Sequence, residues 1–212
     1  MAARIRIPIR WRSVNSSHVS YVRAIEMSAM EKTMANTIRY AFGDSSLGPL
    51  LAAVSERGLA FVGFDASVSE LAMRFPDAEL VEDPAALEAT IGKIAGLVDH
   101  PDADVTIDLD LRGSDFECRV WNALREIPVG TTASYGAIAA RLGAPRQARA
   151  VGEACAANKL AVIVPCHRVV KKDGSISGYR WGERRKRKLL EREHSARLLQ
   201  PAVVPPHGMA AS

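Results

Sequence analysis

The chain has 212 residues, of which 48% are apolar and 25% are charged, and its formal net charge is +4. This composition excludes a disordered or fibrous protein, and the lack of any apolar run of about 18 residues excludes a helical membrane span. Three cysteines at irregular spacing exclude a disulfide framework and a CxxC zinc site, and they indicate a reducing compartment such as the cytoplasm.

The charge is divided unevenly along the chain. Residues 36–111 sum to −10 and residues 112–195 sum to +9, while the first 35 residues contribute +4 and the last 17 contribute +1. This asymmetry predicts two modules, the second of which faces a polyanion such as nucleic acid. A basic face that is merely solvated is the alternative, and charge alone does not decide between the two.

Residues 1–35 form an N-terminal segment without sustained hydrophobic periodicity. A transit peptide, a DNA-binding arm and an over-extended start are all compatible with it, and we expect a mobile tail. Residues 36–111 then predict a small α/β domain in which no group of residues is arranged for chemistry. Its expected strands are Thr37–Gly43, Pro49–Ser55, Leu59–Phe64 and Val105–Leu111, and its expected helices are Val68–Phe75 and Pro84–Val98.

Residues 112–195 predict a helical, DNA-binding type of domain, followed by a C-terminal tail at 196–212. Ser114 and Glu117 form a capping box for one helix, and Ser134 caps a second. A third helix, from about Arg146 to Ala157, follows a tight turn and completes a helix-turn-helix. The remaining expected elements are an apolar β-type run at Leu160–Val164, a hairpin at Val169–Gly174 that would form a wing, and a last helix at Glu183–Glu193.

The third helix is poor in side chains that read bases. Alanine and glycine dominate it, including Ala150 and Gly152, and Arg149 is the one long cation near its start. So thin a surface lets a DNA backbone approach closely in the minor groove, without reading sequence. Tight packing between helices explains the same alanines equally well.

Pro165-Cys166-His167-Arg168 carries the densest chemistry in the chain. Neighbouring cations would lower the pKa of the Cys166 thiol and raise its thiolate fraction, although a buried structural cysteine is the alternative. His167 assists Cys166 only if the chain turns there or a water intervenes. Cys118 and Cys155 have no such neighbours, and we interpret both as packing residues.

Glu193 adds a third member to this group. It follows Leu189 and Leu190 at helical spacing, so we expect it to face the core, where a carboxylate needs a partner. His167 is the natural candidate, and the pattern predicts a relay from cysteine through water to histidine and glutamate. Pairing of Glu193 with residues at the helix end is the alternative.

Together these residues resemble the O6-alkylguanine-DNA alkyltransferases, also called methylated-DNA–protein-cysteine methyltransferases, and in particular the C-terminal half of Ada-type proteins. The resemblance covers roughly residues 36–194. The matching motifs are Val120-Trp121, Ile127-Pro128, Ser134-Tyr135, Arg149-Ala150-Val151, Asn158, Ile163–Val170 and Gly178–Gly182. It implies an α/β + α fold: a ribonuclease-H-like α/β domain at 36–111 and a helical domain with a winged helix-turn-helix at 112–195.

The resemblance also implies a reaction on Cys166. This thiol would accept the alkyl group of O6-alkylguanine in duplex DNA, after base flipping. His167 and Glu193 would generate its thiolate through water, and Asn158 would brace the active-site loop. The thioether product would not be reversed, so each molecule would act once. O4-alkylthymine is a substrate that the resemblance leaves open.

The resemblance assigns the remaining site residues to DNA and to the substrate pocket. Tyr135 would contact the target phosphate and give a proton to the leaving base. Arg149 would fill the space of the flipped base, with Ala150 and Gly152 beside it in the minor groove. The pocket would be lined by Tyr179, Trp121 and the backbone at Val169 and Arg180.

We expect no metal, no cofactor and no membrane partner, and a monomer that binds duplex DNA with little sequence preference. The zinc module and the activator segment of Ada-type proteins are not implied, because residues 1–35 contain no cysteine and are too short. Two other classes of function compete with repair. One is a DNA-binding regulator or damage flag with an inert Cys166, and the other is a cysteine hydrolase, disfavoured because no oxyanion-hole motif is visible.

Overall fold

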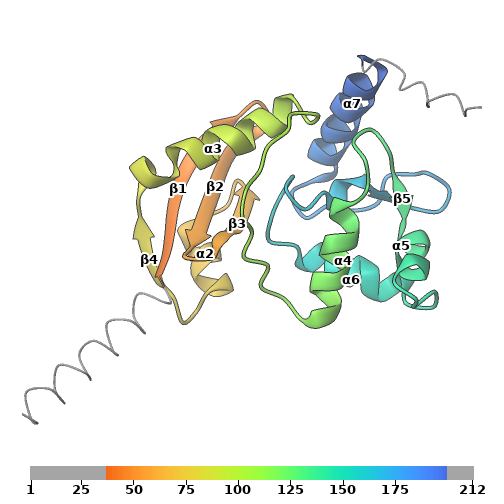
Figure 1. Ribbon diagram of the computed structural model, residues 1–212, viewed down its shortest axis with the longest axis horizontal. Helices are drawn as coiled ribbons and strands as arrows, with labels where there is room; N and C mark the ends of the chain where they lie inside the picture. The colour runs from red at the N-terminus through yellow and green to blue at the C-terminus, as the bar shows by residue number, and fades with distance from the viewer. Residues whose placement is uncertain (1–36, 200–212) are drawn as a thin grey trace, which may run out of the picture. The chain divides into compact units, whose positions relative to one another are not determined.

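The structure is a computed structural model that describes residues 37–199. The expected N-terminal tail and most of the expected C-terminal tail lie outside the described residues. Across 37–199, no helix is both long enough and apolar enough to cross a membrane. The chain has a mixed α/β architecture, with a sheet and two helices in the first half and a group of helices in the second (Figure 1).

A four-stranded sheet organises the first half. Its strands are β1 (Thr37–Ser45), β2 (Gly48–Ser55), β3 (Gly58–Phe64) and β4 (Glu79–Glu82), in the order β3-β2-β1-β4. The first three strands are antiparallel neighbours, as expected from the turn residues between them, whereas β4 pairs with β1 in parallel. Strand β4 was not predicted, because this short edge strand is mostly exposed and carries no alternating pattern.

Two helices cover opposite faces of this sheet. Helix α3 (Pro84–Asp99) begins at the N-cap Asp83 and buries Leu87, Ile94 and Val98 in the larger core. Helix α2 (Val68–Arg74) packs Leu71 against a separate, smaller core on the other face. In β1, Ile38 and Tyr40 belong to the smaller core and Ala41 to the larger one, since side chains along a strand point to opposite faces. The two helices lie on the two sides of the sheet (Figure 1).

The predicted strand at 105–111 is wrong. Only Leu109 forms a bridge, to Leu59 of β3, and the rest of the segment has no ladder. A second segment uses the same edge of β3, because Leu160 forms a bridge with Val62. Two segments therefore share one short edge, and neither has room for a continuous strand.

The predicted β-type run Leu160–Val164 is wrong for the same reason. After its bridge the chain turns, and the amide of Val164 donates to the carbonyl of Leu160 at 3.0 Å. Val162 has φ of 68°, which is unfavourable for a β-branched residue and costs on the order of 1 to 3 kcal/mol. The apolar side chains are buried by a compact turn instead of by a sheet.

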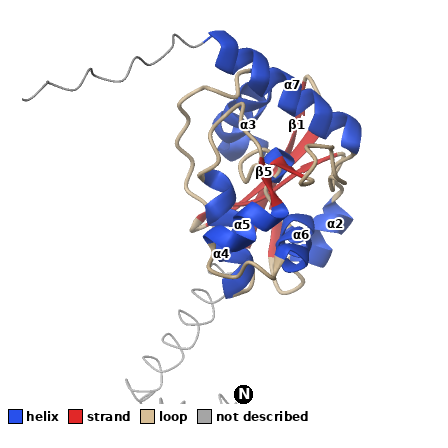
Figure 2. Cartoon of the chain, turned by 90° about the vertical axis from the view of Figure 1, so that its right-hand side faces the viewer, coloured by secondary structure: helices blue, strands red, loops and turns tan. Residues whose placement is uncertain are grey.

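Four helices dominate the second half, and short strands join them. The elements are α4 (Asp115–Arg125), β5 (Ala133–Ser134), α5 (Tyr135–Arg141), α6 (Ala148–Ala157), the 3-10 turn η1 (Cys166–Arg168), β6 (Val169–Val170) and α7 (Glu183–Leu199). The capping box of Ser114 and Glu117 and the Ser134 cap are both present. Helices α4, α5 and α6 pack together at one end of the molecule (Figure 2).

The hairpin expected at Val169–Gly174 has a different pairing. A tight turn does form, with Gly174 at φ of 80° and its amide donating to the carbonyl of Lys171 at 3.0 Å. Strand β6, however, is only two residues long and pairs in parallel with β5. Val169 is thereby held beside the start of α5, and no antiparallel ladder follows the turn.

Ion pairs connect the acidic first half to the basic second half. Arg185 contacts Asp65 at 2.6 Å, and Arg180 contacts Glu70 at 2.8 Å. The charge asymmetry of the sequence thus serves contacts inside the protein, in addition to any external partner.

Candidate active site

Cys166 lies at the first position of η1, directly after Pro165. The chain turns here and does not leave a strand, so the condition for cooperation between Cys166 and His167 is met by the backbone. Both side chains are buried, Cys166 being 5% exposed and His167 0%. The candidate nucleophile is thus held inside the second half of the molecule.

Asn158, the C-cap of α6, braces the loop that leads to Cys166. Its side-chain amide donates to the carbonyl of Val164 at 2.9 Å and to the Cys166 sulfur at 3.2 Å. Its carbonyl oxygen accepts from the amide of Leu160 at 2.9 Å. One buried side chain therefore joins both ends of the strained 160–166 turn to the thiol.

Glu193 faces inward from α7 and pairs with His167. The Nε2 of His167 lies 2.7 Å from the Glu193 carboxylate, and Nε of Arg168 donates to both carboxylate oxygens at 3.0 Å. The amide of Gly130 supplies a further hydrogen bond at 3.2 Å. The alternative of a helix-end pairing is wrong, because α7 continues to Leu199 and Glu193 is 2% exposed.

The pKa values of this pair support a neutral imidazole beside a carboxylate. Burial lowers the pKa of His167, and its hydrogen bond to the Glu193 carboxylate only partly opposes this. Burial raises the pKa of Glu193, but the hydrogen bonds from His167 and Arg168 and the charge of Arg168 outweigh that effect, so its pKa lies below the ordinary value. With Nε2–H donating to Glu193, the lone pair is on Nδ1, which finds no hydrogen-bond partner within residues 37–199. His167 is therefore suited to accept a proton.

The expectation of a lowered thiol pKa is wrong. Burial raises the pKa of Cys166 to about 11, against the opposing hydrogen bond from Asn158 and the charge of Lys186. Arg168, adjacent in sequence, turns away toward Glu193 and the carbonyl of Ile127. Removal of the thiol proton consequently needs a base.

Lys186 is a buried residue of the site that was not predicted from the sequence. It is 0% exposed, and its ammonium donates to the carbonyl of Val169 at 2.6 Å and to the Ser177 hydroxyl at 2.9 Å. Burial lowers its pKa. The available signal was its spacing on α7, because Lys186 precedes Leu189 by three residues and Glu193 by seven, so all three share the core face.

The predicted DNA-contacting residues lie at the surface of α5 and α6. Tyr135 begins α5, and a Cβ atom added to Gly152 would stand 3.7 Å from its ring. Its hydroxyl lies 2.7 Å from the Ser177 hydroxyl. Arg149 has a side chain that is 94% exposed and pairs with Glu153 at 3.1 Å, and Ala150 is partly exposed. Tyr135 thus reaches the buried site, whereas Arg149 extends outward.

Of the predicted pocket residues, Tyr179 lies beside the histidine. Its ring meets the rings of His167 and Trp181 edge-on, with centroids 6.3 and 5.2 Å apart. Its hydroxyl is buried without a hydrogen-bond partner in the described part of the chain. Arg180 is tied to Glu70 and to the carbonyl of Ala156, so the loop carrying Tyr179 is anchored at that point.

Trp121 has a packing position. It is 3% exposed, and its indole N–H donates to the carbonyl of Ala154 at 2.8 Å, which joins α4 to α6. Cys155 is buried as well, and the Cys118 sulfur lies 3.8 Å from the carbonyl of Leu111. In the described residues, no cluster of three or more histidine, cysteine or acidic side chains is placed to hold a metal ion.

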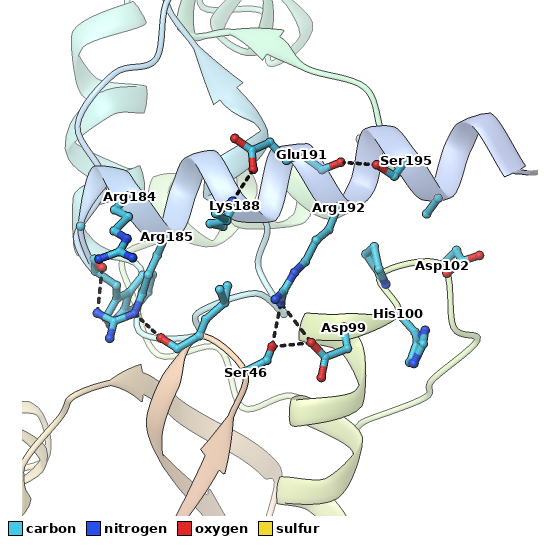
Figure 3. A pocket seen from close by; sticks show the side chains of 15 residues that line it. Ser46, Asp99, His100, Asp102, Arg184, Arg185, Lys188, Glu191, Arg192 and Ser195 are labelled. Atoms are coloured by element: carbon cyan, nitrogen blue, oxygen red, sulfur yellow. Dashed lines mark hydrogen bonds and ion pairs between the residues drawn. The ribbon is translucent and has the colours of Figure 1, made fainter.

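A pocket of about 1010 Å³ lies away from these residues, between α7 and the end of α3 (Figure 3). Arg192 extends from α7 across it, donates to the Ser46 hydroxyl at 2.9 Å and pairs with Asp99 at 3.1 Å. Arg192, Ser46 and Asp99 are thus bonded to one another across this pocket. We interpret the pocket as part of the contact between the first and second halves of the chain.

The family model for the DNA binding domain of 6-O-methylguanine DNA methyltransferase matches residues 115–195. Over 158 residues the chain is 41% identical to the methylated-DNA–protein-cysteine methyltransferase of Mycobacterium tuberculosis, which covers 74% of this chain and 93% of that protein. The chain belongs to the methylated-DNA–protein-cysteine methyltransferase family.

Other members extend the comparison. The bifunctional transcriptional activator/DNA repair enzyme Ada of Escherichia coli is 46% identical over 160 residues, covering 74% of this chain but 45% of that protein. The chain thus spans less than half the length of this relative. A crystal structure of Mycobacterium tuberculosis OGT in complex with DNA matches with a TM-score of 0.66 and 40% identity, over 74% of this chain and 94% of that one.

Proposed function

We propose that this methyltransferase-family protein repairs DNA by direct reversal, transferring the methyl or alkyl group of O6-alkylguanine in duplex DNA to Cys166. The sulfur forms a bond to the alkyl carbon as the bond from that carbon to the guanine oxygen breaks. The product is a stable thioether, so each molecule reacts once. No metal or cofactor takes part.

The observation that carries this proposal is the set of contacts around the buried Cys166 thiol. Asn158 donates to the sulfur, and the neutral His167 is oriented by Glu193, while its second nitrogen has no hydrogen-bond partner among residues 37–199. A water between Cys166 and Nδ1 of His167 would carry the thiol proton to the imidazole, and the carboxylate of Glu193 would stabilise the imidazolium. A thiol with a pKa of about 11 depends on such a base near neutral pH.

The second half is proposed to hold DNA as a winged helix-turn-helix. Helix α6 presents Arg149, Ala150 and Gly152 beside Tyr135, and this thin surface would enter the minor groove without reading sequence. Arg149 is exposed enough to fill the space left by a flipped base. Tyr179 and the backbone at Val169 and Arg180 would line the base pocket. Trp121 would support this domain indirectly, by joining α4 to α6.

The first half is proposed to be a ribonuclease-H-like domain with a supporting role. Its sheet order places an antiparallel meander beside one parallel strand, and its acidic residues pair with arginines of the second half. We infer that the protein acts as a monomer on DNA in the cytoplasm.

The test offers the protein a duplex that contains one O6-methylguanine and then maps methylation by peptide mass spectrometry. We expect one added methyl group on the Cys166 peptide and none with undamaged duplex. Cys166→Ser should abolish transfer and leave DNA binding unchanged, whereas the control Cys118→Ser should transfer normally. If the lesion persists although the protein binds it, the protein is a damage-binding regulator and the proposal is wrong.

A further inference from the structure

A buried chain of hydrogen bonds runs from α7 to the start of α5. Lys186, 0% exposed, donates from its ammonium to the hydroxyl of Ser177 at 2.9 Å. Ser177 is itself buried, and its hydroxyl lies 2.7 Å from that of Tyr135. The chain therefore ends at the half-buried tyrosine, on the side of the molecule proposed to meet the target base.

The chemistry of the three groups gives this chain a direction. A lysine ammonium has donors only, so the Ser177 oxygen accepts from Lys186 and has one proton to donate. The carbonyl of Val169 is 3.3 Å from Ser177 and already accepts from Lys186 at 2.6 Å, whereas Tyr135 is 2.7 Å away. The better acceptor for the Ser177 proton is thus the Tyr135 oxygen, which leaves the tyrosine's own proton free to point outward.

We propose that Ser177 is a positioning residue that passes a proton from Lys186 to Tyr135 while Tyr135 protonates the departing guanine. The inference rests on the proposed function, because it concerns the leaving group of that reaction. Lys186 and Ser177 would thus act on the leaving group, a role separate from activation of the thiol by His167 and Glu193.

The step balances in protons and electrons. The sulfur electron pair forms the new S–C bond, and the electrons of the broken O–C bond remain on guanine. Guanine takes the phenolic proton of Tyr135, the tyrosine oxygen takes the hydroxyl proton of Ser177, and Ser177 takes one proton from the ammonium of Lys186. Lysine ends as a neutral amine, and no outside acid or oxidant is consumed.

Lys186 is suited to lose this proton. As a neutral amine it would still donate to the carbonyl of Val169, and its new lone pair would accept from Ser177, so no buried group is left unpaired. Burial already disfavours its charged form, since Val169 and Ser177 offer it neutral partners only.

Two reactions of Cys166 separate this relay from a general structural effect. One is single-turnover methyl transfer from a duplex that contains O6-methylguanine, with protein in excess. The other is alkylation of Cys166 by iodoacetamide, whose iodide leaves without a proton. A proton relay to the leaving group matters for the first reaction and not for the second.

The key comparison is Ser177→Thr against Ser177→Val, two side chains of the same shape that differ in the hydroxyl. We expect the Thr variant to transfer methyl within about threefold of the unmodified protein and the Val variant to be at least about 100-fold slower, the usual size of a proton-transfer contribution. Both should react with iodoacetamide at the same rate. Ser175→Ala, which removes an exposed hydroxyl on the same loop, is the control for transfer.

Equal methyl transfer by the Thr and Val variants would overturn the relay. So would a parallel loss in both reactions by the Val variant, because that pattern reports a displaced thiol. If the unmodified protein reacts with iodoacetamide but never with the lesion, the proposed repair function itself fails, and the relay fails with it.

Discussion

Two buried ionisable groups on α7, Glu193 and Lys186, share one face of the helix but have opposite surroundings. Glu193 contacts two cationic or protonatable partners, His167 and Arg168, and their interactions outweigh the burial that opposes its charge. Lys186 contacts neutral oxygens, and burial lowers its pKa. A buried group surrounded by countercharges stays ionised and orients its partners, whereas one among neutral dipoles is ready to change its charge. Glu193 would thus support removal of the thiol proton, and Lys186 would supply a proton to the leaving group.

The largest effect on stability and on methyl transfer is expected from substitution of Glu193. Glu193→Gln removes the countercharge of Arg168, whose side chain is only 12% exposed, so we expect a loss of about 3 to 5 kcal/mol in the free energy of unfolding. Methyl transfer should fall sharply as well, because His167 loses its orienting carboxylate. Urea unfolding measures the first effect and single-turnover transfer the second. The neighbouring Glu191→Gln, at an exposed position, should alter neither, and a stable Glu193→Gln protein would contradict the assignment.

Substitution of Lys186 should affect methyl transfer far more than the free energy of unfolding. Lys186→Met keeps the length of the side chain and removes a buried charge, while it leaves only neutral partners unpaired. We therefore expect the free energy of unfolding to change by less than about 2 kcal/mol. Methyl transfer should nevertheless slow at least about 100-fold, as for Ser177→Val, because both the proton source and the charge near Cys166 are lost. Normal transfer by a folded Lys186→Met protein would show that the lysine is structural only.

The pH dependence of stability sharpens the same contrast. The pKa of Glu193 is lowered by folding, so its contribution is present above the unfolded value of about 4.3 and is lost as the pH falls through the folded value. The pKa of Lys186 is also lowered, so the folded state gains stability as the pH rises from the folded value toward about 10.4. The unmodified protein should therefore exceed the Glu193→Gln protein in stability near neutral pH, and the two curves should converge as the pH falls through the folded pKa of Glu193. Relative to the Lys186→Met protein, the unmodified protein should gain stability as the pH rises toward about 10.4. Identical curves would argue against both assignments.

The smallest effect on stability is expected from substitution of Arg149, which contacts neither Glu193 nor Lys186. Arg149→Ala removes an exposed side chain, so the unfolding transition should not move measurably, but transfer from duplex DNA should slow if Arg149 fills the space of the flipped base. Alkylation by iodoacetamide should be unchanged. Arg187→Ala breaks a comparable exposed pair on α7 and serves as the control. Equal transfer by the two variants would remove Arg149 from the proposed DNA contacts.

Local patterns accounted for much of this molecule. The cap residues Ser114 and Ser134 open the helices that were expected, and the turns between the first three strands follow their glycines. The inward direction of Glu193 and its contact with His167 followed from helical spacing and from the need of a buried carboxylate for a partner. These features depend on residues within one or two turns of one another, or on a rule that holds for any buried charge.

What only the tertiary structure decided depends on contacts between distant segments. The apolar runs at 105–111 and 160–164 failed as strands because both compete for the edge of β3, which no local pattern reveals. The sequence determined that Cys166 has a histidine and an arginine beside it, but the fold turned Arg168 toward Glu193, buried the thiol and brought Lys186 near it from α7. A pKa depends on the solvent and charges that surround a group in space, so the residue types at this site could be read from the chain, while the state of its thiol was set by packing.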